Sequence, residues 1–144
     1  MTSRLGPAPE ATSPGVSRSM KGNRGKDTKP EQRLRALLRD AGFPGYRLHW
    51  KGVPGRPDVA YPGRRVAIFV NGCFWHRCPS CQPAAPKSHP EFWDKKFELN
   101  RERDERKTRE LEALGWTVLT VWECELRDDP LSAVAQVVRA LAAD

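Results

Sequence analysis

The chain has 144 residues, enough for one domain around a single hydrophobic core. Its 30% charged and 38% hydrophobic residues are typical of a soluble globular protein, and no segment approaches the roughly 18 apolar residues of a membrane span. With 25 basic and 18 acidic side chains the net charge is +7, which favours a polyanionic partner.

The first 26 residues are rich in Pro, Gly, Ser and Arg, and we expect them to form a flexible basic arm before a folded domain of residues 27–144. No apolar stretch follows Met1, so we expect no secretory signal and a cytosolic protein. Thiols stay reduced in that compartment, so the four cysteines are expected to bind a metal rather than pair as disulfides.

A helix is predicted to begin at Thr28, which can cap it, with Glu31 completing a capping box. Its apolar face would hold Leu34, Leu37, Leu38 and Ala41, and Gly42 would end it. The predicted strands are Tyr46–Trp50, Pro57–Tyr61, Arg65–Val70 and Thr117–Glu123, of which the last two are apolar enough to be central.

Two further helices are predicted. The first is charged and runs from Glu91 to Leu114, and the second runs from Leu131 to Ala142. Leu131, Val134, Val138 and Leu141 would form the apolar face of the second helix. The resulting order α-β-β-β-α-β-α predicts an α/β fold, a mixed sheet flanked by helices. His49 and His89 fit no pattern and are expected on the surface.

The cysteine spacing indicates a metal site. The cysteines are Cys73, Cys78, Cys81 and Cys124, which give the pattern C-x4-C-x2-C followed by one distant cysteine. Four thiolates suit structural zinc, which leaves no open coordination position. The x4 and x2 spacing also fits a plant-type ferredoxin cluster, although the bulky Phe74 and Trp75 disfavour that alternative.

A second set of residues could hold a hard cation. Asp58 enters a predicted strand close to the end of another strand, where its carboxylate could bind Mg²⁺ and support phosphodiester hydrolysis. Asp58 could equally be a turn residue after Gly55 and Pro57. His76 is consistent with a spare zinc ligand, a solvated loop residue or a general base.

Five segments together resemble the very short patch repair (Vsr) endonucleases: "KDTKPE", "PGRPDVAY", "NGCFWHRCPSC", "EFW" and "LGWTVLTVWEC". The resemblance runs from about Ser17 to Cys124 and into the last helix. It implies a fold similar to type II restriction endonucleases. It also implies a magnesium-dependent enzyme that nicks double-stranded DNA 5′ to the thymine of a T:G mismatch left by deamination of 5-methylcytosine. Mismatch-repair proteins and a repair polymerase would be its partners, and the protein would be a nucleoid-associated monomer.

The resemblance also implies residue roles. Asp58 matches the magnesium-binding aspartate, and the backbone carbonyl of Val70 matches a second magnesium contact. His76 matches the histidine that activates the attacking water. Glu31 matches a glutamate that assists nearby, and its role as a helix cap stays open beside this one. The four cysteines match the zinc ligands.

Aromatic residues complete the resemblance. Phe74, Trp75 and Trp93 match side chains that wedge into the base stack beside the mismatch, and Met20 matches a methionine that inserts from the N-terminal arm. We expect Phe74 and Trp75 in a short loop with little core to enter, although core packing stays open as an alternative for both tryptophans.

The sequence departs from the best-known members at two places. Val70-Asn71 stands where they have Thr-His, so a histidine phosphate contact is lost or replaced by the Asn71 amide. Cys78 stands where many members have histidine. Two other functions stay open: a non-catalytic, zinc-containing DNA-binding module, and a related nuclease tied to a restriction-modification system.

Overall fold

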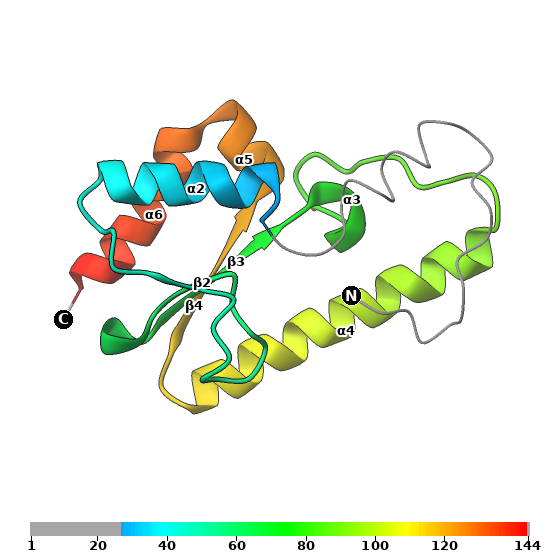
Figure 1. Ribbon diagram of the computed structural model, residues 1–144. Helices are drawn as coiled ribbons and strands as arrows, with labels where there is room; N and C mark the ends of the chain where they lie inside the picture. The colour runs from blue at the N-terminus through cyan, green and yellow to red at the C-terminus, as the bar shows by residue number, and fades with distance from the viewer. Residues whose placement is uncertain (1–26, 144) are drawn as a thin grey trace.

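The computed structural model describes residues 27–143, which form a four-stranded mixed sheet with helices on both faces (Figure 1). The strands lie in the order β1 (Arg47–Leu48), β2 (Val59–Tyr61), β3 (Val66–Asn71) and β4 (Thr117–Trp122). Neighbours are antiparallel except β3 and β4, which are parallel. The helices are α2 (Lys29–Asp40), α3 (Cys73–His76), α4 (Pro90–Ala113), α5 (Glu123–Asp128) and α6 (Pro130–Ala142), with a 3-10 turn at Pro62–Arg64. The predicted fold class is confirmed.

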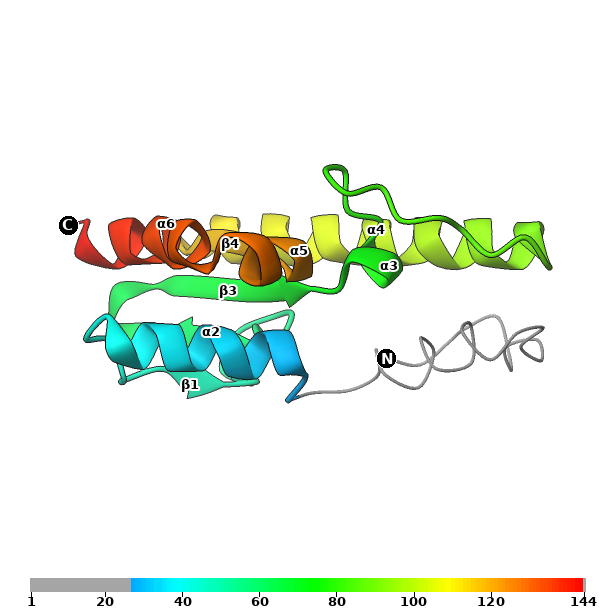
Figure 2. The ribbon, with the colours of Figure 1, turned by 90° about the horizontal axis from the view of Figure 1, so that it is seen from above.

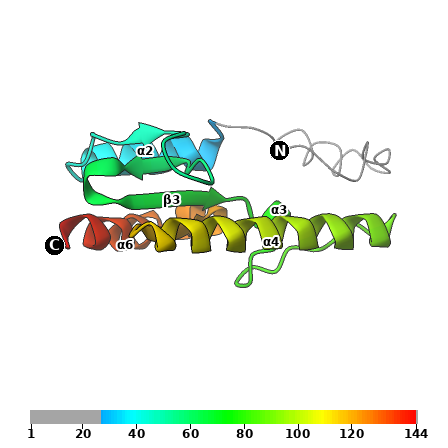
Figure 3. The same cartoon turned by 90° about the horizontal axis from the view of Figure 1, so that it is seen from below.

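The elements are layered. Helices α2, α5 and α6 pack together on one side of the sheet, and α4 lies on the other side (Figure 1). Helix α4 extends well past the end of β3 (Figures 2 and 3), and α3 packs against it there. A parallel pair needs a long crossover connection, and α3, the following loop and α4 make the one between β3 and β4.

The N-terminus of α2 is capped as the sequence predicts. The Thr28 side chain accepts a hydrogen bond from the backbone N–H of Glu31 at 3.4 Å. The Glu31 carboxylate accepts one from the N–H of Asp27 at 3.2 Å, one residue before the expected donor. Gly42 follows the helix with a φ of +92°, a conformation that glycine adopts without a Cβ clash.

The hydrophobic core lies between the sheet and the layer of α2, α5 and α6. Its fully buried members include Leu34, Leu38, Val59, Ile68, Val121, Leu126, Val137 and Leu141. Strand β3 is interior, as predicted. Strand β4, predicted to be central, is instead an edge of the described sheet, and Thr117 and Thr120 are exposed on it. The first strand shortens to Arg47–Leu48, both exposed.

The predicted apolar face of the last helix is partly wrong. Leu131 is 73% exposed, whereas Ala133, Val134, Val137 and Leu141 form the buried stripe. Asp129 caps α6 and Pro130 starts it, so Leu131 falls in the first turn, turned away from that stripe. The sequence analysis also missed α5. Among residues 27–143, no helix combines the length and apolar character that crossing a membrane requires.

The difference between Leu38 and Leu131 is directly testable. Leu38→Ala should lower the free energy of unfolding by about 2–5 kcal/mol, because it removes a fully buried side chain from the core. Leu131→Ala should change it by less than about 0.5 kcal/mol, because that side chain is already in solvent. Urea unfolding of both variants measures this; equal losses would contradict the described packing of α6.

Candidate functional site

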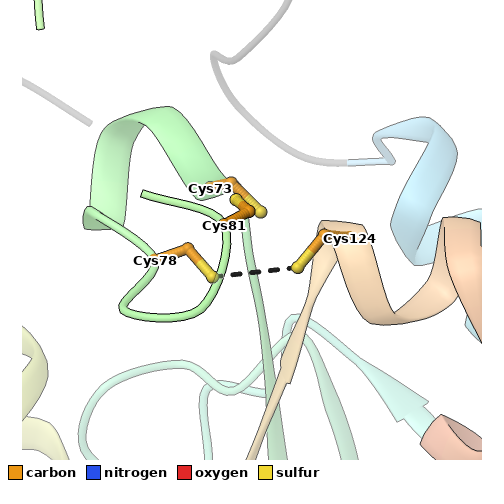
Figure 4. Close-up of side chains that lie close together, drawn as sticks. All are labelled: Cys73, Cys78, Cys81 and Cys124. Atoms are coloured by element: carbon orange, nitrogen blue, oxygen red, sulfur yellow. Dashed lines mark hydrogen bonds between the residues drawn. The ribbon is translucent and has the colours of Figure 1, made fainter. Parts of the chain in front are cut away.

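The four cysteines converge on one point. Cys73 begins α3, Cys78 and Cys81 lie in the loop after it, and Cys124 lies in the first turn of α5 (Figure 4). Their sulfur atoms lie within 4.8 Å of one another, and the Sγ atoms of Cys78 and Cys124 are 3.7 Å apart. Zn–S bonds of 2.3 Å in a tetrahedron place sulfurs about 3.8 Å apart. The cluster therefore has a donor set and spacing that could hold a metal ion.

Burial disfavours the thiolate form of cysteines in this cluster. Desolvation raises the pKa of both Cys73 and Cys124. At Cys78 desolvation also acts upward, but hydrogen bonds from the backbone of Cys81 and Ser80 and from the thiols of Cys124 and Cys81 together lower the pKa. Buried thiolates are costly unless a cation or hydrogen bonds stabilise them, so a metal would complete the site.

The cluster sits where the two parallel strands end. Asn71 and Trp122 are register partners at the carboxyl ends of β3 and β4, so α3 and α5 begin next to each other. The backbone N–H of Cys73 donates to the Glu123 carboxylate at 3.1 Å, which joins the two helices a second time. Helix α3 is thereby fixed at this edge of the sheet.

Asp58 lies immediately before β2 and reaches across to β3. Its Oδ2 accepts a hydrogen bond from the Val70 N–H at 2.8 Å. Burial raises the pKa of Asp58 to about 6, against the lowering effect of that hydrogen bond. The side chain thus bonds to another strand and does not cap its own turn, which argues against the turn-residue interpretation.

Val70 offers a second oxygen atom that could bind a cation near Asp58. The ladder between β2 and β3 ends at Ile68, so on that side the backbone of Val70 has no strand partner and its N–H bonds to the Asp58 side chain instead. The N–H and C=O of one strand residue point toward the same neighbouring strand, so the Val70 carbonyl faces the side of Asp58. A carboxylate and a carbonyl oxygen are ligands that Mg²⁺ prefers, and a half-buried carboxylate with a raised pKa fits a site that takes a cation.

His76 is held by a residue that the sequence analysis did not find. Its Nδ1 lies 2.5 Å from Oδ2 of Asp104 on α4. A carboxylate accepts, so Nδ1 donates and Nε2 is left as a proton acceptor. Asp104 is 28 positions away in a helix crowded with charges, and nothing in the sequence separates it from its neighbours.

His49 was predicted on the surface, and this is wrong, although His89 is exposed as expected. The His49 side chain is 15% exposed, and its Nδ1 lies 3.9 Å from Oδ1 of Asp58. Its Nε2 lies 3.4 Å from Oε1 of Glu31. The His49 N–H donates to the Asp58 carbonyl across the β1–β2 hairpin, which brings the two residues together. The hairpin around "PGRP" was a usable signal for this proximity.

Glu31 sits in a buried ion-pair network. Its side chain is 4% exposed, and Arg35 Nη2 lies 3.3 Å from it and 2.7 Å from Asp27. Asp27, Glu31 and His49 are close enough to share a metal ion, but the Arg35 guanidinium already supplies the positive charge there. Glu31 therefore both caps α2 and faces the site, so the two roles left open are compatible.

These groups line one cavity of about 540 Å³. Its charged and polar lining includes Glu31, Asp58, Asn71, His76, Asp104 and Glu123, with Lys29, Arg56, Arg103 and Lys107 as the basic members. Asp58, His76 and Glu31, far apart in the sequence, therefore meet in one place. Trp75 also lines the cavity. Met20 and the basic arm lie outside the described residues.

An aromatic cluster adjoins the cavity, formed by Phe74, Trp75, Trp93 and Phe97. Neighbouring ring centroids in it are 5.1–5.8 Å apart. Phe74 and Trp75 lie on helix α3 and pack against α4, so the expectation of a short loop with little core is wrong. Trp93 is 3% exposed, which does not fit direct insertion into DNA. Its ring packs against that of Trp75, with the two centroids 5.7 Å apart. Phe74 and Trp75 are half-buried.

The chain is similar in sequence to known proteins. The family model described as DNA mismatch endonuclease Vsr matches residues 12–82. DNA mismatch endonuclease Vsr of Escherichia coli (strain K12) is 41% identical over 111 residues, 77% of this chain and 70% of the relative. The chain belongs to the Vsr family.

Two other relatives of this Vsr-family chain are named as nicking enzymes. Type II nicking enzyme V.XorIIP of Xanthomonas oryzae pv. oryzae is 48% identical over 105 residues, 73% of this chain and 76% of the relative. Type II nicking enzyme V.NaeI of Lentzea aerocolonigenes is 38% identical over 141 residues, 94% of this chain and 84% of the relative. The family resemblance seen in the sequence is confirmed, and with it the restriction-endonuclease-like fold and a DNA endonuclease activity.

Asp58 should make the metal-free protein less stable at neutral pH. Its pKa is about 6 when folded and 3.8 as the ordinary value, so folding binds a proton between these limits and stability falls as pH rises through them. Asp58→Asn should therefore raise the free energy of unfolding by on the order of 2 kcal/mol near pH 7, and by less as pH approaches 4. Thermal melts across pH without added magnesium measure this.

Magnesium supplies the matched control for this variant. It should raise the melting temperature of the unmodified protein, because a ligand that binds only the folded state stabilises it, and leave Asp58→Asn unchanged. If Asp58→Asn is less stable than the parent near pH 7 without magnesium, burial does not destabilise the ionised Asp58 carboxylate.

Proposed function

We propose that this Vsr-family endonuclease nicks double-stranded DNA 5′ to the thymine of a T:G mismatch left by deamination of 5-methylcytosine, and so starts very short patch repair. The observation that carries this proposal is the shared cavity: Asp58 and His76, the latter paired with Asp104, face it together with Trp75. Catalytic groups and an aromatic side chain suited to unstacking bases therefore meet at one surface.

The chemistry we propose is magnesium-dependent hydrolysis. Asp58 and the Val70 carbonyl would hold Mg²⁺, which polarises the phosphate and makes water a better nucleophile when bound. His76 accepts the water proton at Nε2, while Asp104 at 2.5 Å orients the ring and stabilises the imidazolium that forms. Glu31 lines the same cavity and assists through its position beside Asp58.

Mismatch selection would depend on Phe74 and Trp75. Apolar side chains that insert between base steps unstack and bend DNA at a cost of a few kcal/mol. A T:G pair is weaker than a matched pair and opens at lower cost, which favours it in the same sense as in base flipping. Trp93 and Phe97 form the floor that holds the two rings, and Met20 would insert from the arm.

We propose structural Zn²⁺ for the cysteine cluster. The 3.7 Å sulfur separation and the four thiolates support zinc, whose closed site leaves no position for catalysis. The ferredoxin-type alternative would instead give a coloured protein with iron and sulfide. Mismatch-repair proteins and a repair polymerase would act on the nicked product, and the protein would work as a monomer.

A second candidate has its own support. Relatives at 48% and 38% identity are named type II nicking enzymes, which favours a nuclease tied to a restriction-modification system. Such an enzyme would share the chemistry and differ in the bases it accepts around the mismatch. The non-catalytic alternative is disfavoured, because Asp58, His76 and Asp104 are together in one cavity.

The nicking assay tests both candidates. Duplexes that carry each mismatch in several flanking sequences are incubated with protein and magnesium, and nicks are mapped on both strands. The proposal expects one nick, 5′ to the thymine of T:G. Asp58→Ala should abolish it with mismatch binding kept, because the aromatic residues remain. His76→Ala should slow it by ~10²–10⁴-fold. Undiminished nicking by Asp58→Ala would defeat the site assignment, and nicking confined to one flanking sequence would favour the restriction-linked enzyme.

Trp75→Ala tests the wedge. It should weaken T:G binding by ~1–3 kcal/mol and narrow the preference for T:G over T:A, because the lost ring stacks on a base. Trp116→Ala is the matched control: that half-buried ring packs on Trp50 at 5.7 Å, away from the cavity, and its loss should keep the preference. If Trp75→Ala melts far lower yet discriminates normally, Trp75 is a packing residue and not a wedge.

A further inference from the structure

The candidate active-site cavity is lined by side chains of both charges. Four carboxylates line it, from Glu31, Asp58, Asp104 and Glu123, yet its proposed substrate is a phosphodiester anion. Four basic side chains line it too, those of Lys29, Arg56, Arg103 and Lys107. Which of these cations meets the phosphate that is cut decides how the site accepts a negative group.

The cations differ in what their charge acts on. The charge of Arg103, after desolvation, lowers the pKa of Lys96. The Nζ of Lys96 lies 5.9 Å from the ring centroid of Trp75, so Arg103 belongs to the aromatic end of the cavity. The charge of Lys107 acts on Asp58 and lowers its pKa against the larger effect of burial. Lys107 therefore serves the end of the cavity where hydrolysis is proposed.

The stem of Lys107 is held by two segments that also build this end of the cavity. A Cβ added at Gly55 would lie 2.9 Å from Lys107 Cγ, so glycine is what allows the stem to pass. Gly55 also has a φ of +85°, which favours glycine independently. On the other side, Lys107 Nζ lies 5.5 Å from the ring centroid of Phe69, next to Val70.

The ammonium has no carboxylate partner in the described part of the chain. Among residues 27–143, Lys107 forms no ion pair with a carboxylate. The end of β3 supplies no cation either, because its last residue, the buried Asn71, is a neutral amide. Lys107 lies on α4, one turn beyond Asp104, the residue paired with His76, so α4 brings a cation without a carboxylate partner to this end of the cavity.

We propose that Lys107 is a phosphate-binding residue of the active site, whose ammonium contacts a non-bridging oxygen of the phosphate that is cut. It holds that phosphate beside Asp58 and offsets the negative charge that grows as water attacks. The inference rests on the proposed endonuclease function and adds to it the group that binds the reacting phosphate.

The test uses two substitutions in the full chain. Lys107→Met keeps the stem between Gly55 and Phe69 and removes the charge, whereas Lys107→Arg keeps a charge. Arg106→Met is the matched control, because Arg106 is an exposed neighbour on α4 that does not line the cavity. The nick made by the unmodified protein is mapped first. Lys107→Met should then slow single-turnover nicking by ~10²-fold or more, with Lys107→Arg within ~10-fold of the parent.

A binding cycle without magnesium identifies the phosphate. The slope of log affinity against log salt should fall by ~0.9 in Lys107→Met, as for one lost phosphate contact. A duplex with a neutral methylphosphonate at the mapped bond should give the unmodified protein the same reduced slope. On that duplex Lys107→Met should cause no further reduction, whereas Arg106→Met should show no such coupling.

Two results would overturn the inference. The first is nicking by Lys107→Met within ~3-fold of the parent rate, well short of the loss expected for a removed transition-state contact. The second is an equal fall in the salt slope of Lys107→Met on both duplexes, which would place the contact at another phosphate. Because the methylphosphonate is placed at whichever bond the protein cuts, a nick away from T:G would defeat the proposed specificity and leave the Lys107 result readable. A parent protein that cuts no mismatched duplex would defeat both.

Discussion

The cluster of Cys73, Cys78, Cys81 and Cys124 is the constraint on which the geometry of the active site depends. It joins the end of β3, the loop after α3 and the start of α5 at one point. Helix α3 has only four residues, far fewer than a helix needs to be stable alone. Trp75 and His76 both lie on it, so the proposed wedge and the proposed general base are positioned by the same cluster and by packing against α4.

Electrostatics then set what the cavity can hold. Asp58 is buried enough to raise its pKa to about 6, beside an acidic Glu31 that adds to the effect. The Arg35 guanidinium compensates Glu31 and Asp27, whereas Asp58 has no arginine partner among the described residues and is the carboxylate for which we propose a bound cation. A cation there and the ammonium of Lys107 would together place two positive charges beside Asp58, where a phosphate could then bind.

Local patterns predicted the elements whose signals are local. The Thr28 cap, the apolar run of β3 and the long α4 were all readable, because capping and periodicity depend on neighbouring residues. The family motifs pointed to Asp58 and His76, and both residues line the same cavity. Leu131 was misplaced, because several residues of α6 are apolar and only packing selects the buried stripe.

The missed residues are those whose role depends on tertiary contact. Asp104 is one of many charged residues on α4, and only the approach of α3 singles it out for His76. His49 became part of the site through a hairpin that pairs it with Asp58. Trp93 matched a wedge in sequence, yet the aromatic cluster buries it, so a motif gave the location of the residue and not its exposure.

Removal of the cluster metal tests whether the cysteine cluster positions the proposed wedge and the proposed general base. The protein as purified is assayed for zinc, stripped with a chelator, transferred to excess magnesium, and assayed for nicking of T:G and T:A duplexes and for far-ultraviolet circular dichroism. We expect one zinc per chain. The metal-free protein should keep most of its sheet and helix signal but lose its nicking rate and its preference for T:G together. Added zinc should restore both. A metal-free protein that nicks T:G at the original rate and with the original preference would contradict it.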